Sequence, residues 1–293
     1  MELLDGKKLS LEIKQELKRE VDKFLKQNIR APHLVAILVG NDPASEYYVK
    51  SKMKSCTEVG FKSTNLKLSA EISEEELLNQ IDNLNNDDSV DGFIVQLPLP
   101  GHINVDRVLS QVNPDKDVDG FHPLNLGKLI LGLDTFIPAT PLGILEMIRR
   151  YEIPTEGKDI VILGRSNIVG KPLAIALSQK KYPGNATVTL AHSRTKNLTQ
   201  KLKEADIIVA AIGIPHFVKA EMVKKGAVVI DVGINRIVDK SCKSGYRIVG
   251  DVDFDHVATK TSFITPVPGG VGLMTVTSLL LNTFKSYKKR YEL

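Results

Sequence analysis

The sequence lacks the features that mark several classes of protein. It contains no tryptophan and only two cysteines, Cys56 and Cys242, in 293 residues. Because the two cysteines lie far apart, they match neither a disulfide framework nor a metal-ligand motif, and they favour a reducing compartment. No apolar run approaches the roughly 20 residues that span a bilayer, and the first residues, which include Glu2 and Asp5, do not resemble a signal peptide. We therefore expect a soluble, cytoplasmic protein without a metal.

An excess of charge of one sign is also missing. The formal net charge is +4, from 39 basic and 35 acidic residues, and the lysines are spread along the chain instead of forming blocks. This distribution argues against nucleic acid or a membrane as a partner. Hydrophobic residues at 42% and charged residues at 25% are typical of a globular enzyme. The length suits one large domain or two modest ones.

The first third of the chain alternates between helical and strand patterns. Apolar residues recur at helical spacing over residues 9–24, which predicts an amphipathic first helix. Continuous apolar runs of strand length follow at 34–39 and 92–97. Two further helices are expected between these runs. The succession is β-α-β-α-β, which is typical of a parallel sheet covered by helices.

The two helices between the strand patterns have recognisable ends. Asp42 is an N-cap candidate that precedes a proline, and Gly60 is a C-terminal stop. Ser73 and Glu76 form a capping-box pattern ahead of a run of apolar residues. These signals predict one helix from residue 43 to about Val59 and another that starts near residue 74.

The second half of the chain repeats the alternation after a loop-rich stretch. We place the junction near Ala139, where Thr140 is predicted to cap a helix that runs through Tyr151. Strand patterns follow at 159–163, 187–191, 207–211 and 228–232, and residues 274–291 have the pattern of a single helix. The fold class is therefore predicted as α/β with two domains.

A glycine-containing segment joins the first strand of this half to a helix. Residues 164–170 read GRSNIVG and follow the buried-strand pattern 159–163 directly. Glycine lets a backbone approach a pyrophosphate, whose charge is favourable at a helix N-terminus. The spacing of Gly164 and Gly170 differs from the common G-x-G-x-x-G, so a tight turn without a ligand is the alternative. The context favours a dinucleotide site.

The end of the next strand indicates which dinucleotide is bound. An NAD site usually has an acid here for the ribose 2′-hydroxyl, whereas this strand runs into His192, Ser193 and Arg194. A 2′-phosphate would prefer a hydroxyl and a guanidinium, and Arg165 could add a second guanidinium. The sequence therefore favours NADP over NAD, with a solvated Arg194 as the alternative.

Two more strand ends belong to the same predicted crevice. Gly213 follows the run at 207–211, and Ile234 follows the run at 228–232. Ligands of open α/β sheets bind beyond the carboxyl ends of such strands. The glycines near these positions could instead be plain turn residues.

The predicted second helix presents a candidate catalytic group. Tyr48 and Lys52 are four residues apart and share one face. A phenol ring beside an amine could stack an aromatic ring and place a base next to it. A helical lysine is more often simply solvated, as we expect for Lys50 and Lys54. Gln96 ends the strand pattern at 92–97.

Two loops contain further candidates. Asp117 and Asp119 lie in the polar segment KDVDG at 116–120, where one carboxylate could accept hydrogen bonds from an amino-pyrimidinone ring. Turn formation is the alternative for both acids. In the segment TPVPGGVG at 265–272, the prolines restrict the backbone and the glycines that follow allow it conformations that other residues disfavour. The segment could therefore shape the wall of a cleft.

Together these segments resemble the bifunctional methylenetetrahydrofolate dehydrogenase/cyclohydrolase family. They occur in the family's order over nearly the whole chain. The matching stretches are PAS at 43–45 with Tyr48, Val49 and Lys52, VQLPLP at 95–100, KDVDG at 116–120, GRSNIVG at 164–170, ADI at 205–207, VIDVGIN at 229–235, GDV at 250–252 and TPVPGGVG at 265–272.

The resemblance implies an architecture and an activity. An N-terminal α/β domain over 1–138 would bind folate and catalyse, with 273–293 packing back onto it, and a Rossmann-type NADP-binding domain would cover 139–272. The substrates would be tetrahydrofolate one-carbon derivatives, as in the one-carbon metabolism that serves purine biosynthesis. A cytoplasmic homodimer, formed through the cofactor domain, is implied as well.

The resemblance also implies roles for individual residues. Lys52 would be the catalytic amine with Gln96 as its hydrogen-bond partner, Tyr48 would stack on or position the folate, and Asp119 would bind the pterin ring. The substrate site would further include Pro98, Gly269 and Gly270. The cofactor site would consist of Gly164, Arg165, Ser166, Ile168, Gly170, Ser193, Arg194, Gly213 and Ile234.

The chain departs from the family's pattern at two positions. Leu273 stands where the family usually has a proline, at the expected cleft wall, and could alter the fit of folate. Ala139 replaces a common cysteine and touches no proposed catalytic group.

Three other functions remain as alternatives. A folate dehydrogenase without hydrolase activity would have no need for Lys52 with Gln96. A hydroxy-acid dehydrogenase would need a histidine or a lysine–aspartate pair near the nicotinamide, but the six histidines are scattered. A nucleotide-sensing module without chemistry would not explain Lys52, Gln96 and Asp119 together.

Overall fold

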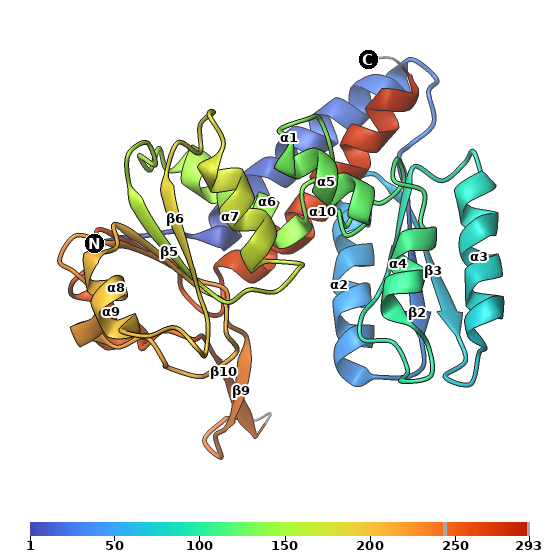
Figure 1. The fold of residues 1–293 in the computed structure, drawn as a ribbon. Helices are drawn as coiled ribbons and strands as arrows, with labels where there is room; N and C mark the ends of the chain where they lie inside the picture. The colour runs from blue at the N-terminus through green and yellow to red at the C-terminus, as the bar shows by residue number, and fades with distance from the viewer. Residues whose placement is uncertain (243–244, 292–293) are drawn as a thin grey trace. The chain divides into compact units, whose positions relative to one another are not determined.

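The computed structural model describes residues 1–242 and 245–291, which form two compact units (Figure 1). The six-stranded unit comprises Met1–Ser10 and Thr140–Thr275. The three-stranded unit comprises Leu11–Ala139 and the chain from Val276 onward. Both units contain a parallel sheet with helices, so the predicted α/β class with two domains is confirmed.

The three-stranded sheet has the order β3-β2-β4. Its strands β2 (His33–Val39), β3 (Lys62–Leu68) and β4 (Gly92–Val95) pair in parallel. Every residue of the central strand β2 is buried, as its continuous apolar sequence requires in a sheet with both faces covered. The edge strand β3 has the more polar sequence KSTNLKL, and its residues are exposed or half-buried.

The helices between these strands begin and end where the sequence predicts. In α2 (Pro43–Val59), the Asp42 carboxylate accepts a hydrogen bond from the Ser45 backbone N–H at 2.8 Å. Gly60 ends the helix with a left-handed φ of 83°. A capping box formed by Ser73 and Glu76 starts α3 (Glu74–Asn86). The end signals at both helices are therefore confirmed.

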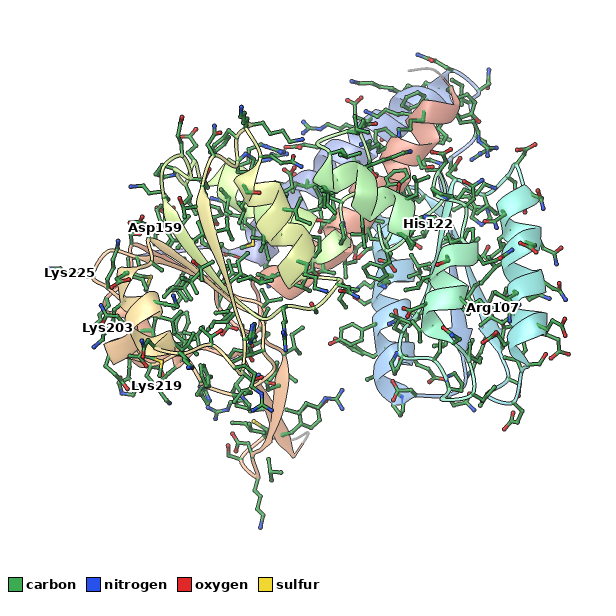
Figure 2. All side chains as sticks on the ribbon, in the orientation of Figure 1. Arg107, His122, Asp159, Lys203, Lys219 and Lys225 are labelled. Atoms are coloured by element: carbon green, nitrogen blue, oxygen red, sulfur yellow. The ribbon has the colours of Figure 1, made fainter. Side chains whose placement is uncertain are left out.

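One face of this sheet is covered by α3 and by α4 (Val105–Gln111). The buried side chains of both helices join those of β2 and β4 in one apolar cluster. At the surface, the guanidinium of Arg107 on α4 pairs with the Glu74 carboxylate on α3 at 2.6 Å (Figure 2). The following helix, α5 (Pro123–Ile130), starts with a cap from the His122 ring.

The six-stranded sheet has the order β1-β11-β8-β7-β5-β6, and every neighbouring pair is parallel. The strands are β1 (Glu2–Leu3), β5 (Asp159–Leu163), β6 (Thr187–Ala191), β7 (Ile207–Ala210), β8 (Val228–Asp231) and β11 (Phe263–Ile264). The four longer ones coincide with the predicted strand patterns. From β5 the chain continues to β6 and then returns across β5 to β7, so the strand order reverses at β5. Ligands of open sheets bind at such a switch point.

Short helices and one hairpin complete this unit. The helices are α6 (Ala139–Arg150), α7 (Gly170–Ser178), α8 (Leu198–Glu204), α9 (Phe254–Ala258) and the 3-10 turn η1 (Ala220–Met222). An antiparallel hairpin consists of β9 (Asn235–Val238) and β10 (Tyr246–Val249). Among the helices that the structure describes, none is long and apolar enough to cross a bilayer.

The predicted cap of α6 is wrong. The helix begins at Ala139, so Thr140 lies inside its first turn. The Thr140 hydroxyl instead shares a 3.0 Å hydrogen bond with the hydroxyl of Thr275. The hydroxyl that the local sequence pattern assigned to capping therefore bonds to a residue that is distant in the sequence.

Two long helices contribute residues to both units. They are α1 (Gly6–Lys26) and α10 (Val271–Arg290). The later part of α10 packs within the three-stranded unit, where the Asn282 amide donates to the backbone oxygens of Val118 at 2.8 Å and Ile137 at 2.9 Å. The predicted return of the C-terminal helix to the first domain is confirmed.

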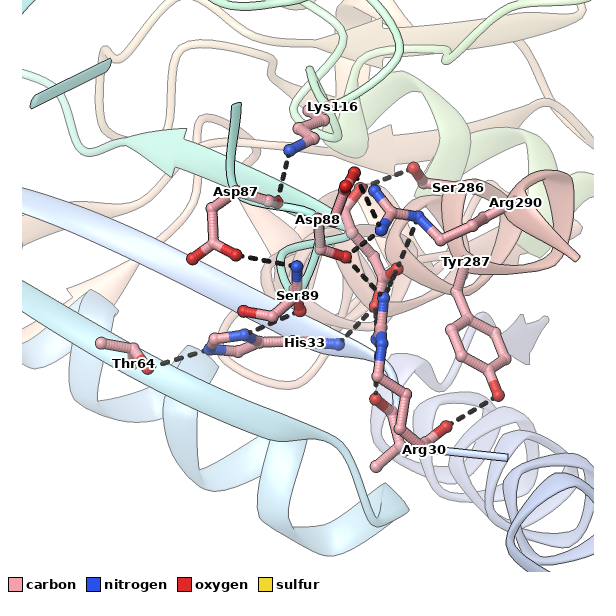
Figure 3. A network of polar contacts seen from close by, with 12 residues as sticks. Arg30, His33, Thr64, Asp87, Asp88, Ser89, Lys116, Ser286, Tyr287 and Arg290 are labelled. Atoms are coloured by element: carbon pink, nitrogen blue, oxygen red, sulfur yellow. Dashed lines mark hydrogen bonds and ion pairs between the residues drawn. The ribbon is translucent and has the colours of Figure 1, made fainter. Parts of the chain in front are cut away.

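A buried acid fastens the end of α10 (Figure 3). The Asp91 side chain is fully buried, and both of its oxygens accept hydrogen bonds from the Arg30 guanidinium, at 2.6 and 2.7 Å. The His33 backbone N–H donates to the same carboxylate at 2.8 Å. Arg290 of α10 lies 3.8 Å from it, and the Ser286 hydroxyl donates to the Asp91 backbone oxygen at 2.6 Å.

We predict that Asp91→Ala lowers the free energy of unfolding by about 3 kcal/mol, because removing one partner of a buried ion pair leaves the other charge uncompensated. Urea denaturation followed by circular dichroism measures the change. Asp88→Ala is the matched control, since the Asp88 side chain is fully exposed and its ion pair with Arg290 spans 3.5 Å. The control should cost less than about 0.5 kcal/mol. Equal losses in the two variants would contradict this account of the network.

Candidate active site and nucleotide crevice

The face of α2 that carries Tyr48 and Lys52 is the starting point of the first site. Lys52 is half-buried, whereas Lys50 and Lys54 on the same helix are exposed. The Tyr48 side chain is 38% exposed and contacts the ring of Tyr47 edge to face. An accessible ring therefore lies one helical turn from a partly desolvated amine.

Gln96 is the hydrogen-bond partner of this amine. The Lys52 Nζ donates to Gln96 Oε1 at 3.0 Å. The Gln96 side-chain nitrogen donates to the Leu97 backbone oxygen at 2.7 Å, and its backbone N–H donates to the Ile37 oxygen at 2.9 Å. The glutamine is thus fixed at the end of β4 with its amide oxygen directed at the lysine. Pro98, two residues further on, is exposed.

Asp119 is a desolvated acid without a donor. Burial raises the pKa of its carboxyl, the positive charge of Lys52 opposes that rise, and the negative charge of Asp117 adds to it. Among the residues that the structure describes, none donates a hydrogen bond to this carboxylate. A carboxylate in that situation gains from a ligand that brings N–H donors.

The neighbouring Asp117 has a different environment. It is buried, and its carboxylate accepts hydrogen bonds from the backbone N–H groups of Phe121 at 3.2 Å and His122 at 2.8 Å. The Asn125 amide donates to it at 2.8 Å. Asp117 therefore forms the turn, and Asp119 is the acid that remains available. Residue type and spacing alone do not distinguish the two acids, whereas the family resemblance singled out Asp119.

The six-stranded unit contains the predicted turn between strand and helix. Gly164 has a φ of 118°, and a Cβ atom there would lie 2.2 Å from the Ala211 backbone oxygen. A Cβ atom at Gly170 would lie 2.0 Å from the Gly164 oxygen. Both positions therefore require glycine. The Ser166 hydroxyl accepts from the backbone N–H of Val169 at 3.1 Å, next to the start of α7.

Exposed cationic and hydroxyl side chains follow β5 and β6 at neighbouring positions. Leu163 pairs with Ala191 in the sheet, so the residues directly after them lie side by side. Arg165, Ser166, Ile168, Ser193 and Arg194 are all exposed. Within the described part of the chain, neither guanidinium has an ion-pair partner. Guanidinium and hydroxyl groups at a helix N-terminus suit phosphate, so these residues fit the phosphates of NADP.

The loops after β7 and β8 reach the same edge of the sheet. Gly213 has a φ of 69° and is exposed, with open space where a Cβ would lie. Ile234 is 48% exposed. Because β7 is paired with both β5 and β8, these two loops continue the row of strand ends that begins at Gly164.

Gly269 and Gly270 lie in the six-stranded unit, whereas Lys52 lies in the three-stranded unit. A Cβ atom at Gly6, the first residue of α1, would lie 2.1 Å from the Gly270 backbone oxygen. The Lys7 N–H donates to the Gly269 oxygen at 3.0 Å. Gly6, which has no side chain, therefore lets α1 start close to this loop. Leu273 follows in α10 and is 40% exposed.

Two buried acids of the six-stranded unit were missed as functional candidates. Asp231 and Asp251 occur in the matching motifs VIDVGIN and GDV, yet the sequence alone assigned neither a role. Their contacts with the loops after β7 and β8 become visible only in the structure. Within the described residues, no group of three His, Cys, Asp or Glu side chains could hold a metal ion.

Comparison with protein families covers almost the whole chain. Residues 4–119 match a model described as the tetrahydrofolate dehydrogenase/cyclohydrolase catalytic domain. Residues 138–291 match the model for the NAD(P)-binding domain of the same enzymes.

Relatives from bacteria are similar over almost their full length. The chain is 57% identical to the bifunctional protein FolD of Bacteroides thetaiotaomicron over 289 residues, which cover 99% of each chain. It is 55% identical to the protein of that name from Christiangramia forsetii, over 100% of this chain and 98% of the other.

Solved structures have a similar fold. The bifunctional FolD methylenetetrahydrofolate dehydrogenase/cyclohydrolase of Campylobacter jejuni matches with a TM-score of 0.93 and 51% identity, over 99% of both chains. The Trypanosoma brucei enzyme, solved with NADP cofactor and inhibitor, matches with a TM-score of 0.93 and 37% identity, over 99% of this chain and 98% of the other.

We predict that Gly164→Ala lowers the free energy of unfolding by about 3 kcal/mol, because the new Cβ meets the Ala211 oxygen in a conformation that alanine also disfavours. Gly157→Ala is the control, since Gly157 has a φ of 68° but open space around its Cβ position. It should cost only about 1 kcal/mol. Chemical denaturation of both variants measures the difference, and equal costs would show that the close approach to Ala211 is unimportant.

Proposed function

The chain belongs to the tetrahydrofolate dehydrogenase/cyclohydrolase family, and on this basis we propose that it is a bifunctional enzyme of one-carbon metabolism. It oxidises 5,10-methylenetetrahydrofolate to 5,10-methenyltetrahydrofolate with NADP and hydrolyses the product to 10-formyltetrahydrofolate. The family resemblance of the sequence motifs is thereby confirmed. The residue roles below are our assignments.

The observation that supports hydrolysis most directly is the Lys52–Gln96 hydrogen bond of 3.0 Å beside the desolvated Asp119. Hydrolysis of a methenyl cation requires water to attack the bridging carbon, after which one ring nitrogen leaves and must gain a proton. In its neutral form, the Lys52 amine accepts the proton of the attacking water and later returns a proton to the leaving nitrogen. Gln96 holds the amine in place, because its own amide is fixed by the backbone at Leu97.

Folate recognition is assigned to Tyr48, Asp119 and Pro98 in the three-stranded unit. The resemblance adds Gly269 and Gly270, which lie in the six-stranded unit, as further candidates. The Asp119 carboxylate would accept hydrogen bonds from the amino group and ring N–H of the pterin, which supply the donors that the protein lacks there. Tyr48 offers an exposed ring face for stacking.

The row of strand ends in the six-stranded unit is assigned to NADP, which accepts a hydride when bound. The segment from Gly164 to Gly170, with the N-terminus of α7, would hold the pyrophosphate. Arg165, Ser193 and Arg194 would hold the 2′-phosphate, since their side chains are exposed at adjacent strand ends. Gly213 and Ile234 would lie along the nicotinamide half of the NADP molecule. The chain's contribution to hydride transfer is alignment of the two rings.

The two domains of the proposal are a catalytic domain over 1–138, with 273–293 packing back, and an NADP-binding domain over 139–272. Within these ranges, residues 243–244 and 292–293 lie outside the described residues. We further assign the enzyme to the cytoplasm, which agrees with two cysteines that are both unpaired.

We expect Lys52→Met to lose at least about 100-fold in cyclohydrolase activity, because the proton acceptor is gone while the side-chain volume is nearly kept. NADP binding should persist. Hydrolysis of added methenyltetrahydrofolate, followed by its absorbance, measures the loss. Lys54→Met, an exposed lysine of the same helix, should hydrolyse like the unmodified enzyme. Intact hydrolysis in Lys52→Met would remove this lysine from the mechanism.

Asp119→Ala should raise the Kd for folate by roughly tenfold or more, since charge-assisted hydrogen bonds contribute about 1.5–3 kcal/mol. The Kd for NADP should not change. Titration calorimetry with each ligand tests both statements, with the exposed Asp115→Ala from the same loop as control. Equal weakening of folate and NADP binding would count against the assignment.

A homodimer formed through the NADP-binding unit is proposed from the family resemblance. Two apolar side chains of the β9–β10 hairpin, Val238 and Tyr246, are 85% and 36% exposed, as expected for residues covered in a dimer. Light scattering after size exclusion should give twice the mass of one chain, and Val238→Glu should reduce it. A mass of one chain for the unmodified protein would refute the dimer.

A further inference from the structure

Two buried acids lie at the strand ends of the six-stranded unit without an assigned role. Asp231 is the last residue of β8 and is 3% exposed, and Asp251 lies just after β10 and is fully buried. No ion pair joins either acid to a cation in residues 1–242 and 245–291. Burying a carboxylate is costly unless hydrogen bonds replace its hydration, so the donors that surround the two acids identify their purpose.

Asp231 is held by backbone donors alone. One of its oxygens accepts from the N–H groups of Gly233 and Asp251, both at 2.9 Å. The other accepts from the Val252 N–H at 2.9 Å. Burial raises the pKa of Asp231 to about 6, and these three hydrogen bonds oppose the rise. The acid therefore fastens residues 251–252 to the end of β8.

Asp251 is bonded to two different loops. Its Oδ2 accepts from the backbone N–H groups of Ile212 at 2.7 Å and Gly213 at 2.9 Å, in the loop after β7. Its Oδ1 accepts from the side-chain amide of Asn235 at 2.9 Å, and Asn235 is the first residue of β9, directly after the loop that follows β8. One carboxylate thus fixes both loops relative to each other.

The glycines around these acids are explained by the same contacts. A Cβ atom at Gly233 would lie 2.3 Å from Asp251 Oδ1, and one at Gly250 would lie 1.8 Å from Asp231 Oδ2. The carboxylates occupy the space that any larger residue would need. Gly233 and Gly250 are therefore required by the two acids and are not simple turn residues.

The position of the two loops along the sheet edge indicates what they serve. The order β8-β7-β5-β6 puts the glycine turn of β5 in the middle and the 2′-phosphate residues Ser193 and Arg194 on the β6 side. A dinucleotide laid across this edge has its nicotinamide half on the side of β7 and β8. Gly213 and Ile234 lie in those two loops.

We propose that Asp251 is a positioning residue for the dehydrogenase reaction, because its carboxylate holds the loops of Gly213 and Ile234 in the arrangement that orients the nicotinamide ring for hydride transfer. The inference rests on the proposed function. It assigns Asp251 no contact with substrate or cofactor. Hydride transfer depends on alignment, and a displacement of about 1 Å can cost about 100-fold in rate.

Asp251→Asn tests the inference, because it keeps the size of the side chain but replaces one acceptor oxygen with an amide donor. At saturating NADP, the dehydrogenase kcat should fall by roughly 10- to 100-fold. The KM for NADP should change little, since the phosphates are held by the loops after β5 and β6. Hydrolysis of added methenyltetrahydrofolate should be unchanged, because Lys52 and Gln96 belong to the other unit.

Asp253→Asn is the matched control. Asp253 lies two residues further on and pairs with the surface residue Lys219 at 3.2 Å (Figure 2), so both activities should be unaffected. If Asp251→Asn does not fold, Asn235→Ala removes a single donor to the same carboxylate and should reduce the dehydrogenase kcat in the same selective way.

Three results would overturn the inference. The first is an equal loss of dehydrogenase and cyclohydrolase activity in the variant that folds. The second is a loss confined to the KM for NADP, and the third is an unchanged dehydrogenase kcat. If the unmodified enzyme reduces no NADP, the proposed function is overturned as well. That outcome is measured on the unmodified enzyme, so it can be distinguished from the three results above, which are measured on variants.

Discussion

The parallel pairing of strands is the constraint on which both candidate sites depend, because it brings successive loops to one edge of each sheet. In the three-stranded unit, it places Gln96 at the end of β4, where its backbone N–H bonds to β2. In the six-stranded unit, it aligns the loops that contain Gly164, Gly213 and Ile234. Residues far apart in the sequence thereby become neighbours.

Loops at such an edge have few backbone partners of their own, and this protein fixes them with buried carboxylates. Asp117 and Asp251 accept hydrogen bonds from backbone N–H groups and from the amides of Asn125 and Asn235. Neutral groups donate the hydrogen bonds to these two carboxylates, and among the described residues neither carboxylate forms an ion pair with an arginine or a lysine. The cationic side chains at the strand ends stay available for phosphate and substrate.

The sequence predicted what local patterns determine. Helix ends at Asp42 and Gly60, the buried strands and the glycine turn all follow from residue type and spacing, and the structure contains them. Prediction from the sequence failed where contacts formed only in the folded structure determine the role of a side chain. The hydroxyl of Thr140 bonds to Thr275 instead of capping a helix. The Asp117 carboxylate bonds to residues 121, 122 and 125, and residue type alone does not reveal which of the two acids makes these bonds. Asp231 and Asp251 were missed because most of their partners, such as Val252 for Asp231 and Ile212 for Asp251, are distant in the sequence.

The residues assigned to hydrolysis and those assigned to NADP lie in different units of one chain. Substitutions should therefore affect the cyclohydrolase and dehydrogenase activities separately. The most direct test is a spectrophotometric assay of the purified enzyme with methylenetetrahydrofolate and NADP, in which reduced nicotinamide and methenyltetrahydrofolate are followed separately. The account predicts that nicotinamide is reduced without accumulation of the methenyl product, and that added methenyltetrahydrofolate is hydrolysed. Reduction with a growing methenyl signal and no hydrolysis would contradict the bifunctional assignment, and no reduction at all would contradict the dehydrogenase.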